Sequence, residues 1–232
     1  MRPRFPSPSP APSVWPCRRP VLAAAALWCG LLAASAARSR APDRRSTADA
    51  AASTAAARRE LASLLDAASE LDDPGQLIAV NAFFNRRIVF RDDLDAWGET
   101  DHWATPLEAL ARGEGDCEDF AIAKYFTLTA LGVPTDRLRL VYMRAWMPGP
   151  PPRLQPHMVL AHFDAPSADP SILDNLVADV QPASRRADLA PVYSFNAYGL
   201  WLGLGPQAAG DPLQRLPRWR QLLRRAQAEG FR

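Results

Sequence analysis

The stretch from Cys117 to Leu131 constrains the fold more than any other part of this chain. After an acidic first turn, polar residues interrupt its apolar surface at only three positions, Lys124, Thr127 and Thr129. A helix that is apolar on nearly every side has to be buried over most of its surface. A glycine and a proline follow Leu131 closely and would end such a helix. The sequence therefore predicts a central helix with Cys117 at its N-terminus.

Helices and strands are both predicted around this central helix, from apolar periodicity and from the positions of glycine and proline. Helices are expected at 58–71, at 73–84 with Asp73 as cap, at 106–111 and at 217–229. Strands are expected at 138–143, 157–163, 171–174 and within 191–202, whereas 92–105 and the Pro-rich 148–156 are expected to be loops. The predicted class is α+β, with the central helix packed on an antiparallel sheet.

The length of 232 residues fits one globular domain, expected at residues 58–232 and ending in a basic helix. Residues 1–37 resemble a secretory signal peptide, with a basic pair, the apolar run Val21–Ala34 and then small residues. A membrane anchor that is never cleaved is the alternative, but the apolar run is shorter than the roughly 20 residues of a spanning helix. Residues 38–57, rich in Ala, Arg and Ser, are expected to form a poorly ordered linker.

Charge and cysteine content narrow the range of functions. The formal net charge is +2, and the basic clusters near the two ends lack interleaved aromatic residues, so no nucleic-acid site is predicted. Two of the three cysteines, Cys17 and Cys29, belong to the leader. Cys117 would remain as an unpaired thiol in an oxidising compartment, where small exported proteins usually form disulfides. A chemical role for this thiol would explain why it is present.

Cys117 has two interpretations. As a small apolar residue it could belong to the core, which is the common fate of a free cysteine. At a helix N-terminus, however, the backbone dipoles favour the thiolate, which is the nucleophilic form. The Gly-Glu-Gly-Asp sequence before Cys117 brings the chain in from a surface loop, so the first turn could equally line a cleft. Local features leave both interpretations open.

A cysteine nucleophile needs a base and a group that orients the base, and the chain offers three histidines. His157 and His162 lie on opposite faces of one predicted strand, so only one of them can face the central helix. If 157–163 and 171–174 form a hairpin that turns near residues 165–166, His157 lies opposite Asp174. Asp174 could then hold the imidazole of His157 while His157 takes the thiol proton. His162 is the alternative base, and His102 lies in the predicted loop.

Three carboxylates surround the candidate nucleophile: Asp116 precedes it, and Glu118 and Asp119 follow it. Their charges oppose thiolate formation. Asp116 could cap the helix and Asp119 could sit in its first turn, but a bound Ca²⁺ would cancel the repulsion more completely. A zinc site made of Cys117, His157 and Asp174 is a poor match to known zinc spacings. The Cys117 backbone N–H, and the Trp103 indole, are candidate oxyanion donors.

These motifs resemble one known family. The run Gly115-Asp116-Cys117-Glu118-Asp119-Phe120-Ala121-Ile122-Ala123-Lys124-Tyr125, followed by His157-Met158-Val159-Leu160 and Leu173-Asp174-Asn175, is similar to the bacterial transglutaminase-like cysteine peptidases of the LapG type. The resemblance covers about residues 60 to 205. It implies a papain-like, transglutaminase-like fold, a periplasmic location, a Cys117, His157 and Asp174 triad, and calcium bound by Asp116, Glu118 and, with less support, Asp119.

The resemblance also implies a substrate and a partner. Members of this family cut large surface adhesins near their N-terminal retention module, often at a dialanine, which releases the cell from a biofilm. An inner-membrane cyclic di-GMP receptor inhibits them through its periplasmic domain. The chain departs from the family in its longer Pro-rich segment 147–156. Two other functions remain open: a transglutaminase-type acyltransferase, which uses the same thioester chemistry, and a non-catalytic periplasmic binding module.

Overall fold

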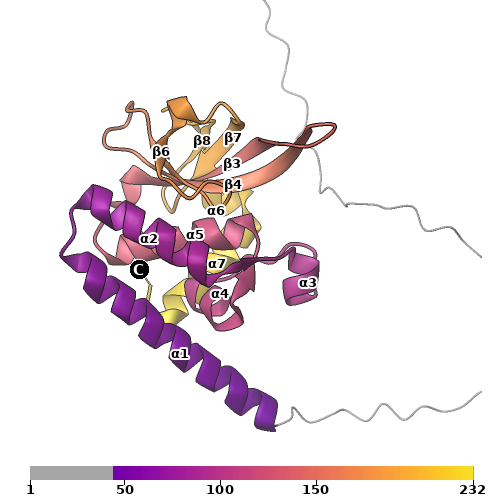
Figure 1. Ribbon diagram of the computed structural model, residues 1–232. Coiled ribbons are helices and arrows are strands. Elements are labelled where there is room, and N and C mark those ends of the chain that lie inside the picture. Colours follow the sequence, from indigo (N-terminus) through magenta and orange to yellow (C-terminus); the bar gives the residue numbers. More distant parts are fainter. Residues whose placement is uncertain (1–43, 232) are drawn as a thin grey trace, which may run out of the picture. The chain divides into compact units, whose positions relative to one another are not determined.

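The computed structural model describes residues 44–231, in which a helical layer packs against one face of an antiparallel sheet (Figure 1). The helices are α1 (Arg44–Ser69), α2 (Asp73–Arg87), α3 (Asp93–Trp97), α4 (Pro106–Arg112), α5 (Cys117–Ala130), α6 (Pro212–Arg215) and α7 (Pro217–Glu229). The strands are β1 (Val89–Phe90), β2 (Glu114–Gly115), β3 (Leu138–Met147), β4 (Arg153–His162), β5 (Ser171–Leu173), β6 (Gln181–Pro182), β7 (Leu189–Phe195), β8 (Leu200–Leu202) and β9 (Ala208–Gly210). Short 3-10 turns, η1 (Thr135–Arg137) and η2 (Ala183–Arg185), connect them.

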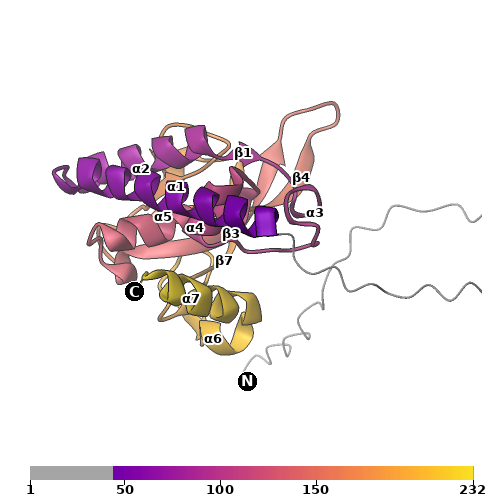
Figure 2. The ribbon, with the colours of Figure 1, turned by 90° about the horizontal axis from the view of Figure 1, so that it is seen from below.

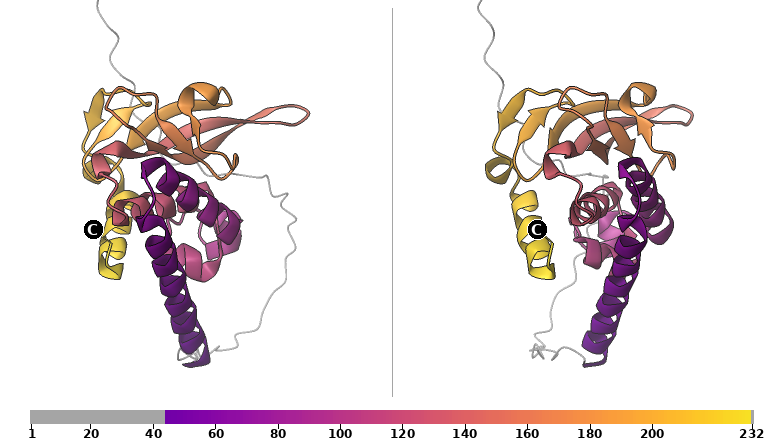
Figure 3. Two further views of the ribbon diagram at one scale, coloured as in Figure 1. Left: turned by 60° about the vertical axis from the view of Figure 1, so that its left-hand side comes forward. Right: turned by 90° about the vertical axis from the view of Figure 1, so that its left-hand side faces the viewer.

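The main sheet has seven strands in the order β6-β5-β4-β3-β7-β8-β9, and every pairing in it is antiparallel. β3 and β4 form its centre as a long ribbon, paired from Leu138 opposite His162 to Met147 opposite Arg153. The helical layer lies below this sheet in Figure 1 and in both views of Figure 3. The predicted α+β class is confirmed.

The central position of α5 is confirmed. Its residues from Asp119 to Leu128 are all buried, and they pack against α2, α4 and β4. Even Lys124 has no exposed surface, and burial lowers the pKa of its ammonium group to about 7, while the negative charge of Asp174 opposes this change. A second, smaller core covers the other face of the sheet, formed by Val141, Met143, Val159, Ala161, Phe163 and Ile172. The central part of the sheet, in β3, β4 and β5, is therefore buried on both faces.

The N-terminal part of the fold differs from the prediction. The segment 38–57 was expected to be poorly ordered, yet α1 is helical from Arg44. Alanine has the highest helix propensity, so the alanine-rich composition favours a helix here. Ala57 and Leu61 are buried and hold this helix against the core. The predicted signal peptide at residues 1–37 lies outside the described residues. Within 44–231, no helix is both long enough and apolar enough to cross a membrane.

The ends of several helices and strands also differ from their predicted positions. The cap of α2 is Asp72 rather than Asp73, since its carboxylate accepts the Gly75 N–H at 3.0 Å. The predicted loop at 92–105 contains α3, and β4 begins at Arg153 inside the predicted Pro-rich loop. The strand expected within 191–202 is a hairpin of β7 and β8. Propensity rules place such ends poorly because capping and pairing partners lie elsewhere in the fold.

The basic C-terminal helix was predicted at 217–229 and is found there as α7, with Trp219 fully buried. We predict that Trp219→Ala lowers the free energy of unfolding by about 3–5 kcal/mol, because it removes a buried aromatic ring. It also removes the indole hydrogen bond to the Asn196 carbonyl at 3.1 Å. Urea unfolding would measure the loss. Arg220→Ala, on the exposed side of the same helix, should change stability by less than about 0.5 kcal/mol, and equal effects would contradict this assignment.

Candidate active site

The chain reaches Cys117 through a short, firmly held segment. Gly113 ends α4 in the left-handed conformation with φ of 75°. β2 then pairs in parallel with β1, and the Arg91 N–H donates to the Gly115 carbonyl at 2.9 Å. A Cβ at Gly115 would lie 2.5 Å from Asp119 Oδ2, so only glycine allows the first turn of α5 to pack here. The glycines before Cys117 therefore fix the position of the candidate nucleophile.

Cys117 is the N-terminal residue of α5 and is partly buried against the main core. Within residues 44–231, the hydrogen bond of its thiol goes to Glu118 Oε2 at 3.2 Å. Burial and the charges of Glu118 and Asp116 raise the pKa of the thiol well above its usual value, and the Met158 backbone N–H lowers it by a smaller amount. In the chain by itself, burial and the carboxylates therefore outweigh the effect of the helix dipole on the thiol pKa, as the predicted like-charge repulsion implies.

The three predicted metal ligands lie around the first turn of α5, and they are buried to different extents. Asp116 occupies the cap position of α5, but its side chain makes no capping hydrogen bond, so the predicted capping role is not found. Asp119 is fully buried and accepts the Ala104 N–H at 2.7 Å and the Trp97 indole N–H at 3.3 Å. Burial raises the pKa of Asp119 to about 8, despite the Ala104 hydrogen bond.

Two further carboxylates, missed by the sequence analysis, join this cluster from the segment around α3. Ligand atoms of Asp93, Asp116 and Asp119 lie within 4.8 Å of one another, and so do those of Asp93, Asp101 and Glu118. Burial raises the pKa of Asp93 to about 7, although the His102 N–H donates to its carboxylate. The acidic residues between 92 and 101 were the available signal, but the segment was interpreted only as a loop.

This five-carboxylate cluster has the chemistry of a site for a hard cation. The buried atoms Asp93 Oδ1 and Asp116 Oδ1 have no hydrogen-bond partner among the described residues. Unpaired buried carboxylate oxygens are costly, and oxygen ligands in this number suit Ca²⁺. Among the residues that the structure describes, Asp101 is the one member with an ion-pair partner, Arg218, whose Nε lies 2.6 Å from Asp101 Oδ2. The residues present therefore fit a calcium ion.

His157 and Asp174 form a buried pair, with His157 Nε2 2.8 Å from Asp174 Oδ1. The predicted register was wrong, since Leu160 pairs with Leu173, which shifts Asp174 two residues from its expected place opposite His157. A shift of two residues keeps a side chain on the same face of a sheet, whereas a shift of one would reverse it. The predicted contact is therefore confirmed, although the register that suggested it is not.

Arg186, which the sequence analysis did not single out, extends this pair. Its Nη2 donates to Asp174 Oδ2 at 2.7 Å, and its Nε donates to Asp188 Oδ1 at 2.9 Å. Burial would raise the pKa of Asp174, but hydrogen bonds from His157, Leu176 and Arg186 lower it to about 2. Ionised Asp174 requires the proton on His157 Nε2, which leaves Nδ1 free to accept a proton.

The other two histidines lie in different surroundings. His162, the alternative base, is at the far end of β4 and is buried, and burial lowers its pKa. Its Nδ1 is 3.7 Å from Asp164 Oδ1. His102 stacks on Trp97 with ring centroids 4.4 Å apart. Asp174 therefore contacts His157 and not His162.

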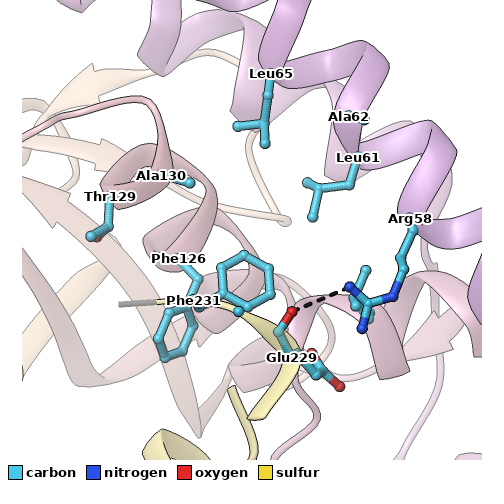
Figure 4. Close-up of a pocket in the computed structure, with 11 residues that line it drawn as sticks. Arg58, Leu61, Ala62, Leu65, Phe126, Thr129, Ala130, Glu229 and Phe231 are labelled. Carbon is cyan, nitrogen blue, oxygen red and sulfur yellow. Dashed lines mark hydrogen bonds between the residues drawn. The ribbon is translucent and has the colours of Figure 1, made fainter. Parts of the chain in front are cut away.

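A cavity of about 480 Å³ lies away from these residues. It is lined by α1, the C-terminal part of α5 and the end of the chain, where Arg58 donates to the Glu229 carbonyl (Figure 4). Its lining contains neither Cys117 nor any of the clustered carboxylates. The chemistry described above is thus concentrated at the N-terminus of α5.

A cysteine at the N-terminus of a buried helix, near a strand that bears a histidine paired to an aspartate, is typical of papain-like cysteine proteinases. The comparisons with known proteins agree. The chain belongs to the bacterial transglutaminase-like cysteine proteinases, whose family pattern matches residues 51–188. The predicted family and its transglutaminase-like fold are confirmed.

Solved structures of LapG from Legionella pneumophila are similar to this chain. The EGTA-treated form is 37% identical over 76% of this chain and 97% of that one, with a TM-score of 0.64. The calcium-bound form is 41% identical over 72% of this chain and 87% of that one, with a TM-score of 0.61. A search of curated protein sequences gave no match.

We predict a specific acid dependence for the His157–Asp174 pair. Because the pKa of Asp174 is lowered from 3.8 to about 2, its ionised form stabilises the fold fully above about pH 4, and this stabilisation disappears as the pH falls toward 2. The shift corresponds to roughly 2 kcal/mol. Urea unfolding at several acidic pH values should show the difference between wild type and Asp174→Asn shrinking as pH falls. Asp164→Asn, at an exposed carboxylate, should show no such trend.

Proposed function

We propose that this protein is a calcium-dependent cysteine endopeptidase in which Cys117 is the nucleophile, His157 the base and Asp174 the group that orients the base. The observation that carries the proposal is the buried His157–Asp174 pair, joined at 2.8 Å. His157 is the chain neighbour of Met158, whose backbone N–H reaches the Cys117 sulfur. A nucleophile, a base and an orienting acid are what thiol proteolysis requires.

In this mechanism His157 Nδ1 takes the Cys117 proton, and the thiolate attacks the carbonyl carbon of the scissile peptide bond. The Cys117 backbone N–H, unpaired at the helix start, stabilises the oxyanion. The protonated imidazole gives its proton to the leaving amine as the C–N bond breaks, which leaves a thioester on Cys117. Water, deprotonated by His157, then hydrolyses the thioester. Asp174 stays ionised throughout, because its pKa lies near 2.

The carboxylate cluster is the proposed calcium site, with Asp116, Glu118 and Asp119 joined by Asp93 and Asp101. Calcium would supply positive charge beside the first turn of α5. Glu118 now accepts the thiol hydrogen at 3.2 Å, so a cation that engages Glu118 would compete for that carboxylate and release the thiol toward His157. A relative at 41% identity has been solved in a calcium-bound form, which supports the assignment.

Membership of the family and the sequence of the leader support three further proposals, on location, substrate and partner. We propose that residues 1–37 direct export and that the mature enzyme acts in the periplasm. Its proposed substrate is the N-terminal region of a large surface adhesin, whose cleavage would release attached cells. Its proposed inhibitor is the periplasmic domain of an inner-membrane cyclic di-GMP receptor.

The triad is tested by separate substitutions. Cys117→Ala and His157→Ala should each lower kcat/KM for cleavage of an adhesin fragment by at least about a thousandfold, because each removes a group that acts in the transition state. His162→Ala is the matched control and should retain activity. Normal cleavage by His157→Ala would overturn the triad.

Mass spectrometry in the presence of an added amine would separate hydrolysis from acyl transfer. Predominant amide products would favour an acyltransferase.

Calcium dependence is tested by chelation. EGTA should abolish cleavage, and Ca²⁺ but not Mg²⁺ should restore it, since this cluster offers more oxygen ligands than Mg²⁺ usually takes from a protein. Calorimetry should show one Ca²⁺ bound, with binding weakened in Asp116→Asn and Glu118→Gln. Glu114→Gln is the control, because Glu114 pairs with Arg91 at 3.0 Å outside the cluster. Unchanged activity and no calcium binding in EGTA-treated protein would refute the site.

A further inference from the structure

The ribbon of β3 and β4 extends beyond the rest of the sheet and ends in the Pro-rich turn (Figures 1 and 3). β5 pairs only with residues 160–162 of β4. Within residues 44–231, no strand pairs with the outer edge of β4 between Arg153 and Val159. This open edge belongs to the strand that carries His157. It therefore leads directly to the candidate active site.

The two rows of side chains on this ribbon differ in what they face. Met158 and Leu160 belong to the main core, against which Cys117 also packs, whereas Val159 belongs to the smaller core on the other face. By alternation, Trp146 and Leu154 lie in the Met158 row, on the face toward α5. They are paired directly across the ribbon. Cys117 packs against the core that this row faces, and its sulfur lies at the edge of β4 beside the Met158 N–H, whereas His157 belongs to the opposite row.

Trp146 and Leu154 are unusually exposed for large apolar side chains in a paired strand, at 53% and 42%. Arg144, also exposed, lies between Trp146 and the active site in the same row. On the helical layer, β1 and α3 lie at the same end of the molecule as the tip of the ribbon (Figure 2). They contain the exposed residues Phe90 and Leu94. Exposed apolar groups rimmed by charge mark binding surfaces more often than inert surface.

The backbone of β4 is suitably oriented for pairing. The Met158 N–H points toward Cys117 and hence away from β3. In an antiparallel pair, alternate residues direct their N–H and C=O groups to the same side, so Leu154 also presents both groups outward. Pro156 offers its carbonyl there and has no N–H to leave unpaired. A strand added at this edge could therefore form backbone hydrogen bonds with β4 from Leu154 as far as the Cys117 thiol.

We propose that the open edge of β4 binds the substrate polypeptide as an added β-strand and delivers it to Cys117. The segment bound is extended, with apolar side chains at alternating positions against Leu154 and Trp146 and a carboxylate beside Arg144. Main-chain pairing supplies affinity in such complexes, and the alternate side chains supply specificity. This inference rests on the proposed function, and it names the chemistry of the substrate that this function leaves open.

Peptide retention tests the inference without requiring cleavage. A randomised synthetic peptide library is passed over immobilised Cys117→Ala protein, and retained peptides are sequenced. We expect peptides with alternating apolar residues and an acidic residue. In a Trp146→Ala, Leu154→Ala background, retention of these peptides should fall at least about tenfold, since buried aromatic anchors dominate binding. Retention that is independent of peptide pattern, or unchanged in this background, would overturn the proposal.

The opposite face of the ribbon supplies a matched control. Met147→Ala with Gln155→Ala alters the neighbouring positions on the same two strands, in the other row, and should leave retention unchanged. The backbone is tested by comparing Leu154→Pro with Leu154→Ala. Proline removes the outward N–H and should weaken retention several-fold further, while an equal effect of the two would argue against strand addition. Thermal melts establish that each variant is folded.

Three further measurements complete the test. When the ribbon substitutions are made in protein that keeps Cys117, iodoacetamide should alkylate it at the wild-type rate, because the nucleophile is not altered. If wild type retains patterned peptides but cleaves none, the proposed proteolysis fails and the binding edge stands. If light scattering shows that wild type dimerises and that Leu154→Pro is monomeric with no peptide bound by either, the edge pairs with a second copy, and the inference is wrong.

Discussion

Like-charge crowding at the N-terminus of α5 is the constraint on which the rest of this structure depends. Five carboxylates converge on one helix start, and burial raises the pKa of Asp93 and of Asp119 instead of leaving them freely ionised. The segment around α3, the β1–β2 pair and the glycines before Cys117 all serve to hold that arrangement. A scaffold that keeps such groups together without hydrogen-bond partners for each oxygen is organised for a cation.

The reactive groups are placed by two independent layers. The helical layer positions Cys117 and the carboxylates, whereas the sheet positions His157 and, through Arg186, the carboxylate of Asp174. Substrate that pairs along β4 would also be held by the sheet. The bound substrate and His157 would therefore move together relative to Cys117. A small shift between the layers would therefore change reactivity without changing either layer internally.

Much of this organisation was predictable from the sequence because its signals are local. The all-apolar run of α5, with glycine and proline after it, defines a buried helix, and α7 follows from Trp219 and its helical neighbours. The contributions of Asp93, Asp101 and Arg186 could not be found in this way. Each acts on a residue distant in sequence, and no periodicity or capping pattern links such residues. The His157–Asp174 contact was predicted correctly from a wrong register. A shift of two residues leaves every side chain on the same face of the sheet, so the contact does not depend on the exact pairing.

The burial of Trp219 bears on where this domain ends. Its ring lies 5.5 Å from that of Tyr125 and 5.3 Å from that of Phe195, centroid to centroid. The family pattern stops at residue 188, before β7 and α7. A chain trimmed to that limit would expose one side of the helix that carries Cys117 to water. Recombinant versions of this enzyme should therefore retain the C-terminal helix, even though the family pattern does not extend to it.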